Sequence, residues 1–265
     1  MISLIQLLKE VQGQPKAIIL AGAPGAGKGY VLKGLDLGGL KIMNVDNIYV
    51  NLLKKANVSL DLKNATPEER SEQAKQMAAA NKQFKGDVEA TIEGKESFIL
   101  DGTGASYNQT VKLKNELEET GYKVFMLYVY TDLERSLSQN QDRYEKSEGK
   151  DRSLAPAIVM RTWKSVTDNL PKYAELFGNN FVAVANTLDD RMKDIDKIIK
   201  KYLTPFKPEG TKPKTPKEQA KSDARKAKDK EEIQIMLNDD FVYDVVEYTM
   251  SKEEAQMRIG KFLSS

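Results

Sequence analysis

The sequence contains neither cysteine nor histidine among its 265 residues. Without cysteine the chain forms no disulfides and no thiolate metal sites. Without histidine, Ser-His-Asp and Cys-His nucleophilic catalysis, most zinc sites and an imidazole general base are excluded. Any proton transfer therefore falls to Asp, Glu, Lys or Tyr.

Long hydrophobic runs and a strong net charge are absent as well. No apolar run approaches the roughly 20 residues that cross a bilayer. The N-terminal segment 1–14 predicts a short amphipathic helix rather than a signal peptide. The formal net charge of +2 gives no global electrostatic reason to bind nucleic acid or a membrane. We therefore expect a cytoplasmic protein that acts without a membrane.

Strand-like apolar runs alternate with helical patterns, which is typical of an α/β fold with a mainly parallel sheet. The five runs lie at 16–22, 40–46, 96–104, 122–131 and 181–187. Ligands of such sheets bind at the carboxyl ends of the strands. The residues expected at or just past those ends are Gly22, Asp46, Asp101, Thr131 and Asn186.

Between the second and third runs, the sequence predicts a long helix. Thr66 is the expected N-cap, with Pro67 in the first turn and Glu69 at the capping-box position. Its apolar residues recur at helical spacing, and Phe84 and Val88 among them are expected to be core contacts.

Composition divides the chain into three segments. Residues 1–203 form the α/β domain, 204–232 a Lys/Pro-rich linker with a solvated helix, and 233–265 a small helical tail. In the tail, helical spacing relates Val242, Val245, Val246 and Thr249, and Ser251 with Glu254 caps a second short helix. So few residues do not bury a core alone. We expect the tail to dock on its own domain, on another copy or on a protein partner.

The first strand leads into a glycine-rich turn, "GAPGAGKGY", at residues 22–30. Its pattern G-x-x-x-x-G-K, between a buried strand and a helix, predicts a phosphate-binding loop. Backbone N–H groups of such a loop surround the phosphates, and Lys28 reaches the outer ones. The expected nucleotide contacts are Gly22, Ala23, Pro24, Gly25, Ala26, Gly27, Lys28, Gly29 and Tyr30. Because Gly29 stands where Ser or Thr usually ligates Mg²⁺, the ion is expected to rely on phosphates, water and carboxylates elsewhere.

Two carboxylates are candidates for the chemistry at the strand ends. Asp101 is expected to contact Mg²⁺, and its alternative role is to cap a helix or stabilise a turn. Asp46 is the expected base that orients an acceptor hydroxyl and takes its proton, with helix capping as its alternative. Thr103, in the "DGTGAS" loop, is expected to contact the substrate.

Arginines are spread along the segment between the fourth and fifth strands: Arg135, Arg143, Arg152 and Arg161. Phosphoryl transfer spreads negative charge over oxygens, and a mobile lid that carries arginines stabilises that charge and excludes water. Arg143 and Arg152 are the expected catalytic pair, because they flank the "YEKSEGKD" turn.

With these motifs in place, residues 15–203 resemble the P-loop kinase superfamily, and are most similar to its zeta-toxin and polynucleotide-kinase-like branch, which includes small kinases carried by bacteriophages. The resemblance is carried by "GAPGAGKG", "NVDNIY", "FILDGTG", the arginine-bearing segment and "FVAVANT". It implies a three-layer P-loop NTPase fold with a five-stranded, mainly parallel sheet, a helical lid and a small helical C-terminal extension. It also implies ATP as the phosphoryl donor.

The sequence departs from these relatives at two positions. In the toxin and polynucleotide kinases an arginine usually follows the catalytic base by three positions, but Tyr49 stands there in this sequence. This difference weakens the assignment of Asp46 as the base by resemblance. Ala105 stands where adenylate kinases place an arginine for the monophosphate, which disfavours a nucleoside monophosphate kinase.

The leading hypothesis is an ATP- and Mg²⁺-dependent transfer of the γ-phosphoryl group to a hydroxyl of a sugar nucleotide, nucleoside or nucleic-acid end. The alternatives are a (deoxy)nucleoside monophosphate kinase and a non-catalytic, nucleotide-dependent binding protein that uses its tail to contact a partner.

Overall fold

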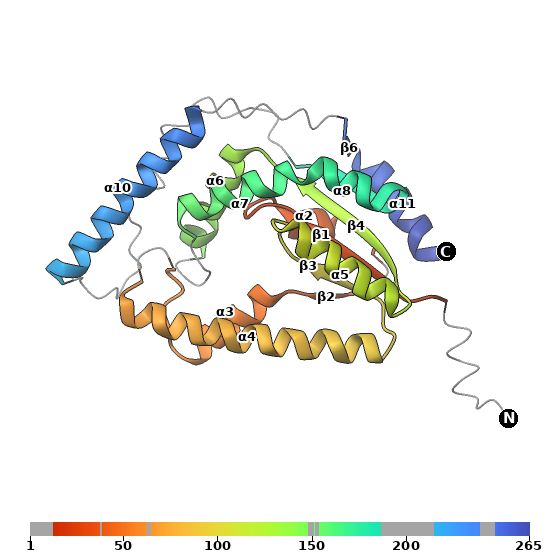
Figure 1. Ribbon diagram of the computed structural model, residues 1–265, viewed down its shortest axis with the longest axis horizontal. Coiled ribbons are helices and arrows are strands. Elements are labelled where there is room, and N and C mark those ends of the chain that lie inside the picture. The colour runs from red at the N-terminus through yellow and green to blue at the C-terminus, as the bar shows by residue number, and fades with distance from the viewer. Residues whose placement is uncertain are drawn as a thin grey trace.

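The computed structural model describes residues 13–37, 39–62, 65–147, 151, 154–186, 215–238 and 247–265. These residues form a six-stranded sheet in the order β2-β3-β1-β4-β5-β6, and every strand pairing in it is parallel (Figure 1). The strands are β1 (Lys16–Ala21), β2 (Lys41–Met43), β3 (Phe98–Asp101), β4 (Lys123–Tyr130), β5 (Phe181–Ala185) and β6 (Thr249–Met250).

Helices cover both faces of the sheet (Figure 1). The helices among the described residues are α2 (Lys28–Lys33), α3 (Val45–Lys55), α4 (Pro67–Glu93), α5 (Tyr107–Glu119), α6 (Leu133–Lys146), α7 (Pro156–Asp168), α8 (Leu170–Phe177), α10 (Pro216–Asn238) and α11 (Lys252–Ser264). α10 packs against α7 and stands apart from the sheet in Figure 1. Parallel strands buried on both faces read as continuous apolar runs, which is why the sequence pattern located five of them.

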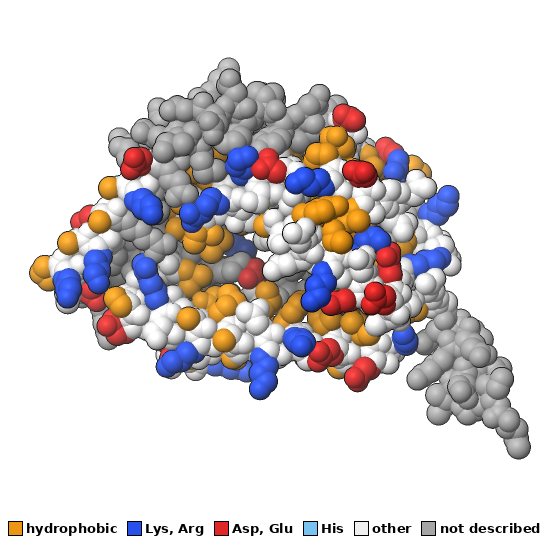
Figure 2. Space-filling view, viewed as in Figure 1, with side chains coloured by type: hydrophobic (Ala, Val, Ile, Leu, Met, Phe, Trp, Pro, Cys, Tyr) orange, Lys and Arg blue, Asp and Glu red, His pale blue; other side chains and the backbone are white. Residues whose placement is uncertain are grey.

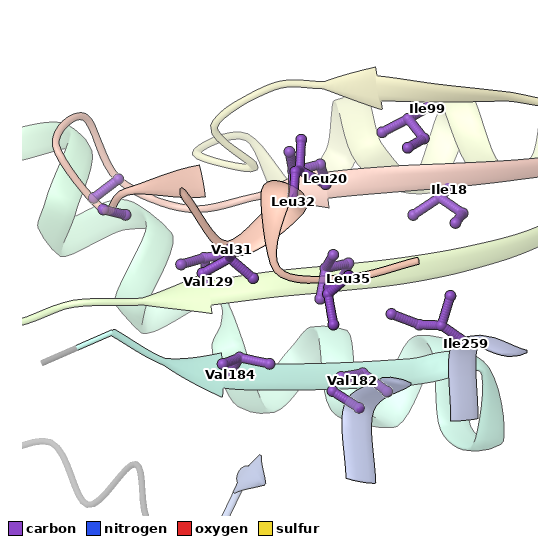
Figure 3. Packing of buried hydrophobic residues seen from close by; sticks show 14 of the residues in the cluster. Ile18, Leu20, Val31, Leu32, Leu35, Ile99, Val129, Val182, Val184 and Ile259 are labelled. Atoms are coloured by element: carbon purple, nitrogen blue, oxygen red, sulfur yellow. The ribbon is translucent and has the colours of Figure 1, made fainter. Parts of the chain in front are cut away.

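The core has one apolar cluster on each face of the sheet. On one face, Ile18 and Leu20 of β1 pack with Val31 and Leu32 of α2 (Figure 3). On the other face, Ile19 of β1 packs in the cluster that includes residues of α5 and α8. Successive strand residues point to opposite faces, so β1, like β3, β4 and β5, contributes to both clusters. The expected three-layer α/β fold is confirmed.

The sixth strand corrects the expectation of five. β6 is only two residues long and joins the sheet through Ala183–Thr249 and Val184–Met250 pairing. A run of two residues carries no readable strand period. Thr249, expected on a helix, therefore lies in a strand, while Val242, Val245 and Val246 lie outside the described residues.

The C-terminal helix docks on its own domain, the first of the three expected possibilities. Ala255, Ile259 and Phe262 of α11 are buried in the same cluster as β1 and β5, and Ile259 lies beside Val182 in Figure 3. The predicted cap is present, since the Ser251 hydroxyl accepts a hydrogen bond from the backbone N–H of Glu254 at 3.1 Å. The expected N-terminal helix falls almost entirely outside the described residues.

The long helix α4 begins as predicted. Thr66 Oγ1 accepts from the Glu69 N–H, and the Glu69 carboxylate accepts from the Thr66 N–H at 2.8 Å, which forms a capping box. Its apolar side differs from the expectation, because Phe84 and Val88 are only half-buried against the sheet cluster. α4 packs closely on α3 through a separate small cluster that contains Tyr49 and Leu53.

Candidate active site

The phosphate loop connects the buried end of β1 to the first turn of α2. Gly25 and Gly27 have φ of 77° and 75°, a left-handed conformation that favours glycine. A Cβ on Gly25 would lie 2.4 Å from the carbonyl oxygen of Ser136 on α6. The loop therefore requires glycine at these positions both for its own shape and for close approach to its neighbours.

Helix α6 holds the loop from one side. The Ser136 hydroxyl donates to the Pro24 carbonyl. The Gln139 amide, oriented so that both its ends are satisfied, donates to the Gly25 carbonyl at 2.9 Å and accepts from Arg135 Nε at 2.7 Å. These bonds fix the carbonyls of the loop so that they face α6.

The carboxyl end of β5 holds the same loop from another side. Asn186 donates from Nδ2 to the Ala26 carbonyl at 2.8 Å, and its own carbonyl accepts from the Thr131 hydroxyl at 3.1 Å. Asn186 is buried, and a Cβ on Gly27 would lie 2.2 Å from its Nδ2. Asn186 and Thr131, noted in the sequence only as strand-end residues, thus support the loop.

Lys28 begins α2 and folds back over the loop. Its Nζ donates to the Gly22 carbonyl at 3.0 Å and lies 3.9 Å from Oδ1 of Asp101 at the end of β3. The loop and β3 are also joined directly, since the Gly22 N–H donates to the Thr103 carbonyl at 3.0 Å. The lysine ammonium and the Asp101 carboxylate are therefore placed at one edge of the sheet, as the sequence predicts.

Asp101 is mostly buried, and burial raises the pKa of its carboxyl. The positive charge of Lys28 and a hydrogen bond from Asn44 oppose this rise, whereas the negative charge of Asp46 adds to it. Oδ1 of Asp101 is buried and has no hydrogen-bond partner among the described residues. A buried carboxylate oxygen with unused lone pairs is a suitable ligand for a cation.

Asp46 lies in the first turn of α3, not at the end of a strand as expected. β2 stops at Met43, and Asn44 is the N-cap of α3. Asn44 Oδ1 accepts from the Asp46 N–H at 2.7 Å, while its Nδ2 donates to Oδ2 of Asp101. Asn44 therefore joins the backbone of the turn that carries Asp46 to the carboxylate of Asp101, and the sequence analysis missed it.

A model of the zeta toxin family matches residues 4–198 of this chain. The chain belongs to the zeta toxin family. No curated protein matches the chain.

Several solved structures are similar to this chain. The crystal structure of AvrRxo1-ORF1:AvrRxo1-ORF2 with sulphate ions is 15% identical with a TM-score of 0.52, and the match covers 96% of this chain and 82% of that chain. The PezAT toxin-antitoxin system of Streptococcus pneumoniae is 16% identical with a TM-score of 0.48, covering 88% and 94%. The Pnkp1/Rnl/Hen1 RNA repair complex is 17% identical with a TM-score of 0.43, covering 60% and 46%. At 15% identity and a TM-score of 0.52, the likeness to the AvrRxo1 complex shows the fold alone.

The family and the fold identify this zeta toxin family member as a P-loop kinase, a phosphotransferase. No helix among the described residues is long and apolar enough to cross a membrane.

Of the two arginines expected to act in catalysis, only Arg143 lies among the described residues of this zeta toxin family member. Arg143 lies on α6, more than half exposed, and forms an ion pair with Asp151; its charge also acts to lower the pKa of Asp101. With Arg135 and Lys146 it lines a cavity of about 400 Å³ along α6, which continues from the Gln139 contact with the loop. Arg152 lies outside the described residues, so the pairing of Arg143 with Arg152 stays a prediction.

Tyr49, which departs from the family pattern, and the residues that follow Lys28 have clear positions. Tyr49 is 3% exposed and packs between α3 and α4, so it does not replace an arginine in the site. Gly29 and Tyr30 are exposed at the start of α2, and Lys252 of α11 lies with its Nζ 4.6 Å from the centre of the Tyr30 ring.

Thr103 and its loop are supported from α8. Thr103 Oγ1 accepts from the Ala105 N–H, and the Gly104 carbonyl accepts from the Tyr173 hydroxyl at 2.7 Å and from Asn169. Tyr173 is also buried in the apolar cluster on that face of the sheet, so it supports the loop by packing as well as by this hydrogen bond.

Proposed function

We propose that this kinase transfers the γ-phosphoryl group of ATP, with Mg²⁺, to a hydroxyl of a sugar nucleotide, nucleoside or nucleic-acid end. The observation that carries the proposal is the meeting of Lys28 with Asp101 at 3.9 Å, beside the N-terminus of the helix that bears Asp46. A phosphate-binding cation, a metal-ligand carboxylate and a candidate base thus share one edge of the sheet.

Each residue has a distinct role in this proposal. The backbone N–H groups of the loop around Gly25 and Gly27, with Lys28, hold the β- and γ-phosphates. Asp46 accepts the proton of the attacking hydroxyl, which the absence of histidine leaves to a carboxylate. Arg143 and Arg152 neutralise the charge that develops on the transferred group, and Thr103 contacts the acceptor.

Asp101 is the proposed protein ligand of Mg²⁺. Its buried Oδ1 has the unused lone pairs that a hard cation requires. The described residues contain no group of three Asp, Glu, His or Cys side chains suited to a metal. Phosphate oxygens and water are therefore the other ligands, and the ion supplies positive charge to the phosphates.

The proposal is tested by transfer of labelled γ-phosphate from Mg²⁺-ATP to a panel of UDP-sugars, nucleosides, nucleoside monophosphates and 5′-hydroxyl oligonucleotides. Lys28→Ala should abolish transfer, whereas Lys33→Ala, at an exposed lysine of the same helix, should leave it unchanged. Tight ATP binding without transfer to any acceptor would contradict the proposal and favour a nucleotide-dependent binding protein.

A further inference from the structure

The C-terminal segment reaches the same edge of the sheet as the candidate active site. β6 pairs in parallel with β5 through Val184 and Met250, so both strands end at that edge. Asn186 follows β5 and supports the phosphate loop, while Lys252 follows β6 and begins α11. Ligands of parallel sheets bind at the carboxyl ends of the strands. A lysine outside the range matched by the family model, 4–198, is therefore placed at the ligand-binding edge.

Helix α11 is held along α2, the helix that begins at the phosphate loop. Gln256 bonds to the backbone of Asp36 in both directions: its Oε1 accepts from the N–H at 2.7 Å, and its Nε2 donates to the carbonyl at 3.1 Å. Ala255 and Ile259 are buried in the same apolar cluster as Val31 of α2. These contacts fix the position of α11 relative to the loop.

The first residue of α11 lies over an aromatic ring of α2. Nζ of Lys252 is 4.6 Å from the centre of the Tyr30 ring, within the range of a cation–π interaction. Tyr30 comes two positions after Lys28, and its side chain is 65% exposed. The helix dipole favours cations at the C-terminus of a helix, so it does not explain a lysine at this position. An ammonium over a ring keeps N–H donors that point away from the ring.

Charge at the loop depends on individual side chains. Figure 2 shows Lys and Arg side chains among Asp and Glu side chains on one face of the molecule, and the formal net charge of the chain is only +2. The molecule as a whole therefore attracts a triphosphate only weakly. Cations beside the loop, such as Lys28, have to supply the attraction, and Lys252 is a further cation next to the helix that Lys28 begins.

We propose that Lys252 binds the α-phosphate of the donor nucleotide and that Tyr30 positions the Lys252 ammonium. The inference rests on the donor of the proposed function and adds a contact from the C-terminal segment. Lys28 and the loop keep the β- and γ-phosphates. Because the charge of the α-phosphate does not change during transfer, Lys252 contributes to nucleotide binding and not to the chemical step.

The order of the strands supports the α-phosphate as the group that Lys252 contacts. β3 and β2 lie on one side of β1, whereas β4, β5 and β6 lie on the other. Asp101 ends β3, and Asp46 lies in the helix after β2, so the proposed acceptor is on the first side. The γ-phosphate faces the acceptor, and the rest of the nucleotide extends away from it. Lys252, after β6, is on that second side.

A pair of lysines on α11 tests the contact. Calorimetry with Mg²⁺-ATP should show that Lys252→Ala raises the Kd by about tenfold, because a charge-assisted hydrogen bond is lost. Lys252→Arg should keep most of the affinity. Lys261→Ala, at an exposed lysine near the other end of the same helix, should change the Kd by no more than about twofold. An unchanged Kd in Lys252→Ala, or an equal rise in both alanine variants, overturns the proposal.

A substituted nucleotide tests which phosphate is contacted. ATP with sulfur in place of one non-bridging oxygen of the α-phosphate exists as two diastereomers. Sulfur is a weak hydrogen-bond acceptor, so the diastereomer whose sulfur faces Lys252 should bind the natural protein more weakly than the other. In Lys252→Ala the two affinities should become closer. A difference of the same size in both proteins would overturn the assignment to the α-phosphate.

The positioning role of Tyr30 is tested by a double-mutant cycle. Tyr30→Leu removes the ring and should raise the Kd for ATP by about two- to fivefold. If Tyr30 acts through Lys252, the variant with both Tyr30→Leu and Lys252→Ala should bind ATP as weakly as Lys252→Ala alone. Effects that add in the double variant would overturn the positioning role.

Kinetics separate this inference from the proposed function. With an acceptor that is phosphorylated, Lys252→Ala should raise the KM for ATP and leave kcat within about twofold, because the contact is the same in the ground state and the transition state. A fall in kcat at unchanged KM would overturn the inference while the proposed function stands. If ATP binds but no acceptor is phosphorylated, the proposed function fails, and the Kd values still decide the role of Lys252. A natural protein that does not bind ATP would overturn both.

Discussion

At the level of single residues, the side chain of Asn44 joins the carboxylate of Asp101 to the backbone of the helical turn that carries Asp46. One end of its amide caps α3 and so fixes the first turn that carries Asp46, while the other end donates to Asp101. The sequence analysis placed Asp46 at a strand end because the apolar run at 40–46 has no evident break. The signal that could have corrected this is an Asn directly before a helical pattern, which is a preferred N-cap.

Asn44→Ser separates the two roles of this residue. Serine still caps the helix but is too short to reach Asp101, so folding stability should fall by less than about 1 kcal/mol. We expect kcat to fall by about tenfold. The acid limb of the pH–rate profile should move to higher pH, because the lost hydrogen bond helps to lower the pKa of Asp101. Asn44→Ala should lose stability as well. An unchanged pH profile in Asn44→Ser would contradict the positioning role.

The buried charge of Asp101 should lower the free energy of unfolding of the protein. Burial raises its pKa, so the charged form costs folding free energy above that pKa, and the cost disappears below about 3.9, where the folded and unfolded states are both protonated. Asp101→Asn should therefore unfold at a higher temperature than the natural protein at pH 7, and the difference should shrink toward pH 4. Asp87→Asn, at an exposed carboxylate of α4, serves as the control. A lower Tm for Asp101→Asn at pH 7 would exclude this account.

At the level of elements, the phosphate loop is held between α6 and the end of β5. The loop itself is visible in the sequence, because a motif of seven residues between a strand and a helix is local. The residues that hold the loop in place are not visible in the sequence, since Ser136 and Asn186 lie 112 and 160 residues from their partners in the loop. Hydrogen bonds over such separations leave no periodic pattern.

Two glycines of the loop give a matched pair of positions for testing whether α6 and the end of β5 hold the loop in place. In Gly25→Ala, the new Cβ would meet the Ser136 carbonyl at 2.4 Å with φ at 77°. We expect a loss of about 1–3 kcal/mol in the free energy of unfolding and a large loss of ATP affinity. At Gly29 nothing lies within 4 Å and the residue is helical, so Gly29→Ala should keep or raise stability by up to about 1 kcal/mol. Thermal unfolding measures the stability of both variants, and calorimetry measures their affinity for ATP. Equal stability and equal ATP affinity of the two variants would contradict the role of α6 in holding the loop.

At the level of the whole molecule, the C-terminal segment completes the α/β domain. β6 extends the sheet beyond β5, and α11 covers one face of it, with the Phe262 ring 4.9 Å from that of Phe125. The sequence analysis recognised that the segment needed a partner surface, because it is too short to bury a core. It did not identify which surface, since the contacts are made across most of the length of the chain and β6 is too short to show a strand pattern.

The contribution of the segment to stability can be measured at two positions of α11. Phe262 is 6% exposed, so Phe262→Ala should lower the free energy of unfolding by about 3–5 kcal/mol. Met257 is 68% exposed, and Met257→Ala should change it by no more than about 0.5 kcal/mol. Denaturant unfolding measures both. If the two variants were equally stable, α11 would not be part of the folded core.

The account as a whole depends on Asp46 as the group that takes the proton of the acceptor. The most direct test measures single-turnover phosphoryl transfer and ATP binding side by side in the natural protein and in Asp46→Asn. We predict that the rate of transfer falls by about 10²–10⁴-fold while the Kd for ATP stays the same, because the phosphates are held by the loop and Lys28. An Asp46→Asn variant that transfers phosphate at the natural rate would contradict the central claim.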